Sequence, residues 1–180
     1  MTGSAYYLLM PSQRFATAKP ESEGDADALR SLWHALGRSE RIADPPMLCW
    51  VSEPEDVADW KWGLPYVCLL STAFREIIDA HLRPADELQW VAAKLKVGSM
   101  EEDRWIPHFP GPRDVLDADR TDWGPSGLPV RWVLSETKLK DVAVTSLPHE
   151  SGDFIVSADI MRALRRAKLT GYTVMRARFE

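Results

Sequence analysis

The chain has 180 residues, a formal net charge of −5 at pH 7, 45% hydrophobic residues and 27% charged residues. These proportions are those of a soluble globular protein, and a domain of this length buries roughly 70% of the surface of its unfolded chain. The acidic balance argues against nucleic acid as a partner, because phosphates require a basic surface. It suits a basic partner protein, although an acidic surface also simply keeps a protein in solution.

Cysteines and apolar runs indicate a reducing compartment and no membrane partner. Cys49 and Cys68 fit neither a CxxC pair nor a zinc ligand set, so we expect two buried, reduced thiols. No apolar run approaches the roughly 20 residues that span a bilayer. The N-terminal "AYYLLM" is too short for the hydrophobic region of a signal peptide and has no basic flank before it. We therefore expect a cytoplasmic protein.

The first third of the sequence predicts strands that alternate with helices. The β-rich "YYLLM" at Tyr6–Met10 predicts a strand, and "MLCWV" at Met47–Val51 predicts another. Between them Gly37 can close a helix whose apolar residues recur at helical spacing, namely Leu29, Leu32, Trp33 and Leu36. In "SEPEDVADWKWG", Ser52 and the acidic residues after it predict the start of a further helix.

The clearest local pattern is "LLSTAFREIIDAHLRP". It predicts a helix over Ser71–Arg83, with Ser71 as the N-cap and Pro84 beyond its end. The predicted apolar face of this helix consists of Phe74, Ile77, Ile78 and Leu82. From Glu87 to Val97 a strand is predicted, because Val91, Ala93, Leu95 and Val97 alternate with polar positions such as Lys94 and Lys96. "GSMEED" then predicts a turn, and "RWIPHF" a short strand.

A long exposed loop is predicted for residues 110–129, "PGPRDVLDADRTDWGPSGLP", because proline, glycine and aspartate dominate it. Loops of this length inside compact domains are often functional. "VRWVLS" and "VAVTSL" follow as two predicted strands.

The C-terminal segment predicts a β-α-β unit. "FIVS" predicts a strand, Ser157 caps the helix that follows, and one helical face carries Ile160, Leu164 and Ala167. Gly171 supplies a left-handed residue to stop the helix, and "YTVMRARF" alternates as a closing strand. Such a unit normally makes a right-handed crossover between parallel strands.

Together these elements predict an α+β fold. We expect a single domain over residues 1–180, with a mixed β-sheet, a few packed helices and the C-terminal β-α-β unit. No internal repeat and no linker divides the chain.

No local motif for catalysis stands out. The four histidines, His34, His81, His108 and His149, show neither HExxH spacing nor another metal-ligand pattern, so packed or solvated side chains are expected. No serine has the framing of a nucleophile elbow, and neither a Walker loop nor GxGxxG is present. We expect no catalytic residues, no metal and no cofactor.

The loop segment "DVLDADRTD" leaves one alternative open. Asp117 and Asp119 form a DxD pair with Asp114 and Asp122 nearby, and several carboxylate oxygens can hold a divalent cation. The pattern lacks the glycine and the distant glutamate of an EF-hand loop. Aspartates in loops also commonly cap turns through their side-chain oxygens, which makes a solvated loop the competing interpretation.

Eight tryptophans are an unusually high number for this length. Trp33, Trp90 and Trp132 lie in periodic segments and are expected in the core. Trp60, Trp62, Trp105 and Trp123 lie among charges, prolines or glycines in the sequence, so some of them are expected to be partly exposed. An exposed tryptophan surrounded by carboxylates suits a basic protein surface. The predicted partner-binding residues are Trp60, Trp62, Glu101, Glu102, Asp103, Trp105, Asp117, Asp119, Asp122 and Trp123. Ordinary half-buried tryptophans are the alternative interpretation.

The order of these features resembles the Myxococcus-type immunity proteins of bacterial polymorphic toxin systems, the eleventh of the numbered immunity families. The likeness is carried by "YYLLM", "LPYVCLLSTAFREIIDAHLRPADELQWVAAKLKV", "DVLDADRTDW" and "FIVSADIMRALRRAKLTGYTVMRARF". Thr121 stands where a serine is usual in that family, and residues 13–62 match least. The pattern consists of folding signals and offers no catalytic group to carry over.

The resemblance implies a non-enzymatic cytoplasmic protein that binds and neutralises a cognate toxin domain by covering its active site. Nucleases, deaminases, NAD-consuming enzymes and ADP-ribosylating enzymes are candidate toxins, and an acidic inhibitor favours a basic substrate groove such as that of a nuclease. Two alternatives stay open. One is a small enzyme with a motif-less site, metal-assisted through Asp117 and Asp119, and the other is an adaptor of a secretion system.

Overall fold

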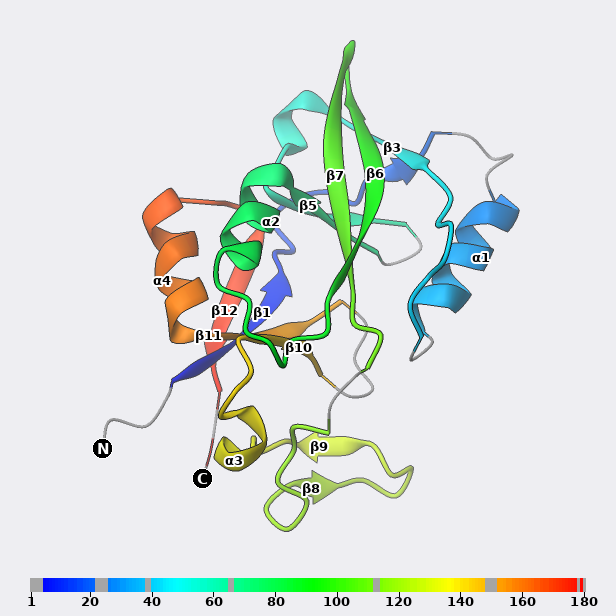
Figure 1. The fold of residues 1–180 in the computed structure, drawn as a ribbon. Coiled ribbons are helices and arrows are strands. Elements are labelled where there is room, and N and C mark those ends of the chain that lie inside the picture. The colour runs from blue at the N-terminus through cyan, green and yellow to red at the C-terminus, as the bar shows by residue number, and fades with distance from the viewer. Residues whose placement is uncertain are drawn as a thin grey trace.

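Two β-sheets form the framework of the fold, and four helices and a small ribbon pack around them (Figure 1). The computed structural model describes residues 5–21, 26–37, 40–64, 67–111, 114–147, 152–177 and 179. The helical elements are α1 (Ala26–Leu36), the 3₁₀ turn η2 (Pro54–Asp56), α2 (Thr72–Asp79), α3 (Glu136–Leu139) and α4 (Ala158–Ala167). The strands are β1 (Tyr6–Pro11), β2 (Lys19–Pro20), β3 (Leu48–Ser52), β4 (Trp60–Gly63), β5 (Val67–Ser71), β6 (Gln89–Val97), β7 (Met100–His108), β8 (Asp122–Trp123), β9 (Pro129–Arg131), β10 (Val144–Ser146), β11 (Phe154–Ser157) and β12 (Tyr172–Arg176).

The sheets contain both parallel and antiparallel pairs, which confirms the predicted α+β fold. One sheet has the order β10-β11-β1-β12 and is antiparallel throughout. The other has the order β2-β3-β6-β7-β5-β4, in which β3 and β6 are parallel. In the C-terminal β-α-β unit, β11 and β12 are both antiparallel to β1 and therefore parallel to each other, with β1 between them.

The two sheets meet where the backbone of Trp60 approaches the turn before β12. The Trp60 N–H donates to the Thr170 carbonyl oxygen at 3.1 Å. Gly171, with φ of +89°, lies against the same strand, and a Cβ there would overlap the carbonyl oxygen of Trp60. A glycine is required at this position because both the backbone conformation and the close approach exclude a side chain.

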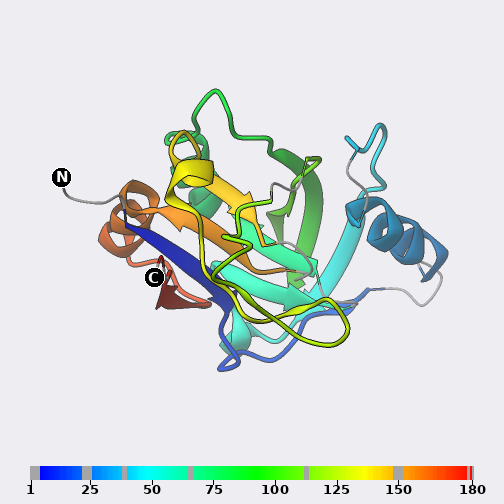
Figure 2. The ribbon, with the colours of Figure 1, turned by 90° about the horizontal axis from the view of Figure 1, so that it is seen from below.

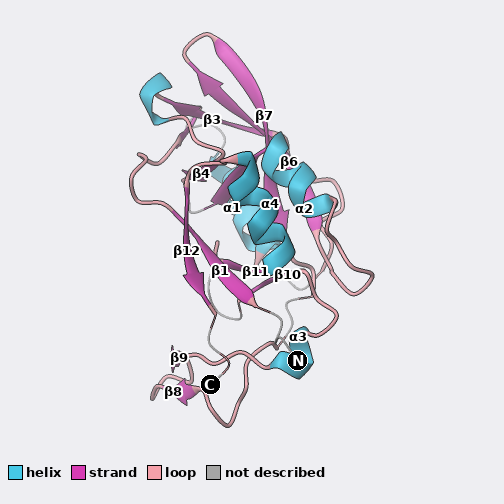
Figure 3. Ribbon diagram, turned by 90° about the vertical axis from the view of Figure 1, so that its left-hand side faces the viewer, coloured by secondary structure: helices cyan, strands magenta, loops and turns pink. Residues whose placement is uncertain are grey.

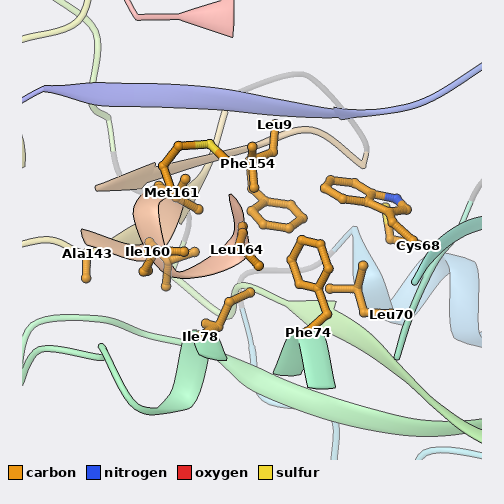
Figure 4. Close-up of a cluster of buried hydrophobic side chains, with 13 residues drawn as sticks. Leu9, Cys68, Leu70, Phe74, Ile78, Ala143, Phe154, Ile160, Met161 and Leu164 are labelled. Atoms are coloured by element: carbon orange, nitrogen blue, oxygen red, sulfur yellow. The ribbon is translucent and has the colours of Figure 1, made fainter. Parts of the chain in front are cut away.

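The largest core cluster lies between the sheets, under α2 and α4 (Figure 4). Trp60 stacks on Phe154 with 4.7 Å between ring centroids and meets Phe74 edge to face at 5.7 Å. Ile78 of α2 and Leu164 of α4 close this cluster from the helix side. Each large apolar side chain buried in this way stabilises the fold by roughly 1.5–3 kcal/mol. A second cluster packs α1 against the six-stranded sheet, and a third lies beneath β1 and α3.

Several predicted elements are confirmed, and their local causes are visible. The Ser71 hydroxyl oxygen accepts the Phe74 N–H at 3.2 Å, which makes Ser71 the N-cap of α2. In β6, Val91, Ala93, Leu95 and Val97 are buried while Lys94 and Lys96 lie on the other face. Strands β1, β3, β11 and β12 and helix α1 also lie where the sequence predicts them, to within one to three residues at either end.

The helix predicted after Ser52 is wrong. Ser52 is the buried last residue of β3, Pro54 starts only a 3₁₀ turn, and β4 follows. Helix α2 ends at Asp79, four residues before the predicted end, and Leu82 is exposed beyond it. The predicted turn "GSMEED" is shorter than expected, because a tight turn at Gly98 brings Met100 directly into β7.

The C-terminal helix also differs in detail. Ala167 is exposed and Met161 is buried, so the apolar face of α4 runs through Ile160, Met161 and Leu164. Lys168, with φ of 56°, is the left-handed residue that ends α4, in place of Gly171. Ser157 occupies the N-cap position, but its hydroxyl makes no capping hydrogen bond.

The predicted loop over residues 110–129 is partly ordered against the core. Val115 and Leu116 are buried, and Leu116 forms an isolated bridge to Leu134. Strands β8 and β9 form a short ribbon at the end of this segment, so only the first residues of "VRWVLS" are strand. Helix α3, which the sequence pattern does not indicate, lies between that segment and β10.

Candidate partner-binding surface

The ten predicted contact residues lie on three separate parts of the molecule. Trp60 and Trp62 belong to β4, a second group from Glu101 to Trp105 belongs to the β6–β7 hairpin, and a third group from Asp117 to Trp123 precedes and enters the β8–β9 ribbon. The hairpin projects from one end of the molecule and the ribbon lies at the opposite end (Figures 1 and 3). The ten residues therefore form no single surface.

The two tryptophans of β4 belong to the core. Trp60 is 1% exposed, so the prediction that it is a partly exposed anchor is wrong. It is buried because β4 turns this side chain towards Phe154 and Phe74, which no local pattern reveals. Trp62 is half-buried and packs against the same cluster, with Gly152 beside its ring. Trp60 is therefore closed to a partner, while the role of the half-buried Trp62 stays a prediction.

Trp105 on β7 is covered by helix α2. The guanidinium of Arg75 lies 3.8 Å from the Trp105 ring centroid, and the indole N–H donates to the Thr72 hydroxyl at 3.2 Å. On the same face of the hairpin, the Trp90 indole N–H donates to Asp79 at 2.7 Å. Both tryptophans are half-buried parts of the contact between α2 and the hairpin.

The carboxylates around Trp105 form ion pairs within the hairpin. The Lys94 ammonium pairs with Asp103 at 2.8 Å and with Glu101 at 3.3 Å, and these bonds raise the pKa of Lys94. The buried Arg104 pairs with Glu102 at 2.6 Å. All three carboxylates of the predicted group are therefore paired, but with only two cations, so the hairpin keeps one net negative charge and much of its attraction for a basic partner is offset.

The β8–β9 ribbon exposes apolar side chains to solvent. Trp123 is 46% exposed, Leu128 50% and Val130 77%. The Trp123 indole N–H donates to the Ala118 carbonyl oxygen at 3.2 Å, which fixes the ring while leaving its face accessible. Asp122 lies 3.9 Å from Arg131 across the ribbon. Figure 2 shows the yellow-green segment that contains the ribbon nearest the viewer, when the molecule is seen from below.

We call the residues Asp119, Asp122, Trp123, Leu128 and Val130 the ribbon surface. Its base is held rigidly, because Val115, Leu116 and Leu134 belong to the third core cluster. The Val133 N–H donates to the Thr121 hydroxyl at 3.2 Å, and the Lys138 ammonium donates to the Leu116 carbonyl oxygen at 2.7 Å. An exposed apolar segment on a rigid base is the usual architecture of a recognition loop.

The DxD pair acts as a turn cap. Asp117 accepts the N–H groups of Asp119 and Arg120 at 3.2 and 3.3 Å, as an Asx turn does. Asp114 is paired with Lys138 at 2.7 Å, and this hydrogen bond lowers the pKa of Asp114. Asp119 is exposed and forms no ion pair with another described residue. Across the described residues no three His, Cys, Asp or Glu side chains gather as a ligand set, so this geometry does not favour the metal-assisted alternative.

Two ribbon residues, Leu128 and Val130, are absent from the predicted contact set. The sequence does contain a pattern that indicates them. The turn "GPSG" between Trp123 and the apolar residues that follow is typical of a hairpin. Gly127, with φ of +75°, provides the left-handed residue of that turn. The abundance of proline, glycine and aspartate in this segment instead predicts a long exposed loop.

The other tryptophans are buried or half-buried, and two of the histidines contact backbone carbonyl oxygens. Trp90 and Trp132 are half-buried against the core, Trp33 is half-buried on α1, and Trp50 is fully buried. Histidine ring nitrogens lie 2.7 Å from backbone carbonyl oxygens at His81 and His108. His34 is exposed on α1, and His149 lies outside the described residues.

Two buried, reduced thiols are predicted, and the burial is confirmed for Cys68 but not for Cys49. Cys68 is buried and Cys49 is half-buried, and both are free. Burial raises the pKa of both thiols, and the neighbouring Glu21 carboxylate adds to the effect at Cys49, whose pKa is about 11. Both side chains are therefore neutral thiols at physiological pH, which makes them poor nucleophiles.

In the part of the chain that the structure describes, no helix combines the length and the apolar character needed to cross a bilayer. Comparison with known proteins finds no match, either among protein-family models or among curated sequences.

Proposed function

We propose that this protein is a cytoplasmic immunity protein that binds a bacterial toxin domain and covers its active site. The observation that carries the proposal is the exposed apolar ribbon surface, where Trp123, Leu128 and Val130 stand on a rigid base. Large exposed apolar side chains on one short ribbon suit a protein interface. Tryptophan in particular is enriched among the residues that dominate binding energy.

The charges at the border of the ribbon surface favour a basic toxin. Asp122, which directly precedes Trp123, lies 3.9 Å from Arg131, while the exposed Asp119 carboxylate has no ion-pair partner among the described residues. A net charge of −5 for the whole protein attracts a cationic groove over a distance and speeds encounter. A nuclease, whose groove is built for phosphates, is the toxin class with the most suitable charge.

The resemblance to the Myxococcus-type immunity family supports the same function. In that family the protein acts by binding, without a catalytic group. Of the two alternatives, the metal-assisted enzyme draws no support from the loop geometry. The Asp117 carboxylate accepts hydrogen bonds within the turn, and the Asp114 carboxylate forms an ion pair with Lys138. Cytoplasmic residence belongs to the proposal, because the candidate toxins act on targets inside the cell.

The decisive experiment pairs this protein with the toxin domain encoded by the adjacent reading frame. We expect cells that express both to grow, cells that express the toxin alone to die, and the purified proteins to form a tight 1:1 complex that abolishes toxin activity. An unrelated acidic protein of the same size is the control. Loss of protection together with the absence of a complex would overturn the proposal. Weak binding to several secretion components would favour the adaptor.

A further inference from the structure

Strand β12 is a free edge of the four-stranded sheet. Its strand pairing is entirely with β1, from Tyr7 opposite Arg176 to Pro11 opposite Tyr172. Figure 3 shows β12 at the border of the sheet, beside β1. No other described strand lies next to it in the sheet order.

The hydrogen-bond register shows which backbone groups on β12 are unpaired. Ser12 N–H donates to the Gly171 carbonyl oxygen at 2.8 Å, and Ala177 N–H donates to the Tyr6 carbonyl oxygen at 2.9 Å. Because bonding alternates along an antiparallel pair, residues 171, 173, 175 and 177 face β1. The N–H and C=O groups of Tyr172, Val174 and Arg176 therefore point to the opposite side, where none has a backbone partner in the described chain.

The backbone carbonyl group just before β12 on this outer side already accepts a hydrogen bond from another strand. The Thr170 carbonyl oxygen faces outward in the same register and accepts the Trp60 N–H at 3.1 Å. The edge is therefore accessible to a backbone where β4 approaches it, and it becomes free from Tyr172 onward. Three consecutive outward-facing residues offer three donors and three acceptors to an added strand.

Two arginines lie on one face of the sheet at this edge, and two further cations lie close to it along the chain. Arg176 lies opposite Tyr7 in the register, and the Arg165 guanidinium lies 5.7 Å from the Tyr7 ring centroid, so both cations occupy the same face of the sheet. Lys168 ends the helix just before the strand, and Arg14 follows the Ser12 contact with Gly171. Within the described residues, no carboxylate forms an ion pair with any of these four cations.

One carboxylate at the start of this edge, Asp59, keeps its charge but is held by hydrogen bonds from its neighbours. It accepts the Thr170 N–H at 2.8 Å and the hydroxyl groups of Thr170 and Ser71 at 3.1 and 3.0 Å. The edge of β12 is thus a local basic region on a protein of net charge −5. Its four cations differ from Lys94 and Arg104 of the hairpin, which are paired with carboxylates.

We propose that the β12 edge binds an extended acidic segment of a partner protein by strand addition. Backbone hydrogen bonds to Tyr172, Val174 and Arg176 supply affinity, and carboxylates that reach Arg165 and Arg176 select an acidic sequence. This surface is separate from the ribbon surface and does not depend on the proposed immunity function. Either proposal can fail while the other stands.

Two other occupants are less compatible with these observations. A second copy of this chain paired along β12 would supply backbone hydrogen bonds, but it would add further unpaired arginines to the same sheet instead of the carboxylates that these cations lack. The phosphates of a nucleic acid could pair with the cations, but a nucleic acid has no row of alternating hydrogen-bond donors and acceptors to match a strand edge.

The test uses two fluorescent seven-residue peptides, one alternating valine with glutamate and the other valine with lysine. Amide hydrogen exchange is followed residue by residue. We expect the N–H groups of Tyr172, Val174 and Arg176 to exchange rapidly in the free protein and to be protected by the glutamate peptide alone. Thr173 and Met175 should be protected throughout, because they face β1.

Charge reversal gives a second readout. The double variant Arg165→Glu, Arg176→Glu should bind the glutamate peptide at least about tenfold more weakly and acquire affinity for the lysine peptide. The variant Val174→Pro removes one outward N–H without removing an N–H that bonds β1, and it should abolish binding of the glutamate peptide. Unchanged melting temperatures establish that these variants are folded.

Several results would overturn the proposal. They are the absence of protection by either peptide, equal protection by both peptides, and slow exchange at all three amides in a free protein that proves to be dimeric. Binding of a single-stranded oligonucleotide in place of the glutamate peptide, without protection of the edge amides, would assign the region to nucleic acid instead.

Discussion

The guanidinium carbon of Arg75 lies 3.8 Å from the centroid of the Trp105 ring and joins α2 to the β6–β7 hairpin. Arg75 is held in place by Asp79, 3.1 Å away on the same helix. We expect Arg75→Ala to lower the free energy of unfolding by about 1 kcal/mol, the range of a partly exposed cation–π contact. A double-mutant cycle with Trp105→Leu, measured by urea denaturation, should return a coupling of similar size.

The control for this prediction is Arg162→Ala on α4, which removes an exposed arginine paired with Asp159 and stacked on no tryptophan. Its effect should stay within about 0.5 kcal/mol. If the Arg75 and Trp105 substitutions prove additive, the stack contributes nothing to stability and Trp105 becomes available again as a contact residue.

Ser71 and Ser157 occupy equivalent N-cap positions but differ in their hydrogen bonds. The Ser71 hydroxyl accepts the Phe74 N–H at 3.2 Å and donates to Asp59 at 3.0 Å. The Ser157 hydroxyl is buried without a partner in the described chain. We expect Ser71→Ala to destabilise the protein by about 1 kcal/mol. Ser157→Ala should be neutral or stabilising, because it removes an unsatisfied buried group. Equal losses in thermal unfolding would contradict this assignment.

Gly171 and Gly98 form a second matched pair. Both have positive φ, +89° and +60°, but a Cβ at Gly171 would overlap the backbone of Trp60, while nothing lies within 4 Å of a Cβ at Gly98. Gly98→Ala should cost about 1 kcal/mol from backbone strain alone. Gly171→Ala should cost at least about 3 kcal/mol, because the join between the two sheets must shift as well. Denaturant midpoints of the two variants give the comparison, and similar values would show that the sheets do not depend on this contact.

The Cys49 thiol should react slowly with alkylating reagents. Burial, followed by the Glu21 carboxylate, raises its pKa from the ordinary value of 9.0 to about 11. At pH 8 its thiolate population is therefore about a hundredfold below that of an ordinary thiol. We expect the iodoacetamide rate, followed by mass spectrometry, to rise about tenfold per pH unit up to pH 11. A plateau near pH 9 would refute the shift.

The same shift has a consequence for stability. Because the folded-state pKa of Cys49 is raised, the neutral thiol contributes stability that is fully present below pH 9 and is lost as the pH rises towards 11. Cys49→Ala should therefore lose less stability than the original protein between these pH values. Parallel stability curves for the two proteins would show that this thiol is not linked to folding.

The sequence predicts elements where short-range physics decides them. Alternation in residues 89–97 identifies β6, because one face of that strand is buried and the other carries Lys94 and Lys96. Ser71 identifies the start of α2 because a cap acts within three residues. The sequence predicts the end of α2 too late, because the helical spacing of apolar residues continues to Leu82 although the helix ends at Asp79.

Properties that depend on distant residues are the ones that local patterns miss. Trp60 has charged neighbours in the sequence, yet it is buried because Phe154 and Phe74 reach it from other elements. The charge pairing on the hairpin was in principle predictable. If "GS" is taken as a two-residue turn, Lys94 falls opposite Asp103, and an ion pair between them is expected. The ribbon surface was half predicted, through Asp119, Asp122 and Trp123, because its turn signals were attributed to a loop.

The ribbon surface can be tested with two exposed apolar residues on opposite ends of the molecule. Val130 is 77% exposed on the ribbon, and Met100 is 62% exposed at the tip of the β6–β7 hairpin. Both positions tolerate aspartate without loss of core packing, so both variants should retain the original stability within about 0.5 kcal/mol. Val130→Asp should weaken toxin binding at least tenfold (about 1.4 kcal/mol), because it places an unpaired charge in a desolvated contact.

Met100→Asp should leave toxin affinity within about twofold, because the hairpin tip lies far from the ribbon (Figure 1). Calorimetric titration of each variant with the toxin domain, beside a growth-protection assay, gives both affinity and function. The opposite pattern, with Met100→Asp weakened and Val130→Asp unchanged, would move the interface to the hairpin. The immunity function would then stand, because it depends on protection, while the assignment of the ribbon surface would be withdrawn.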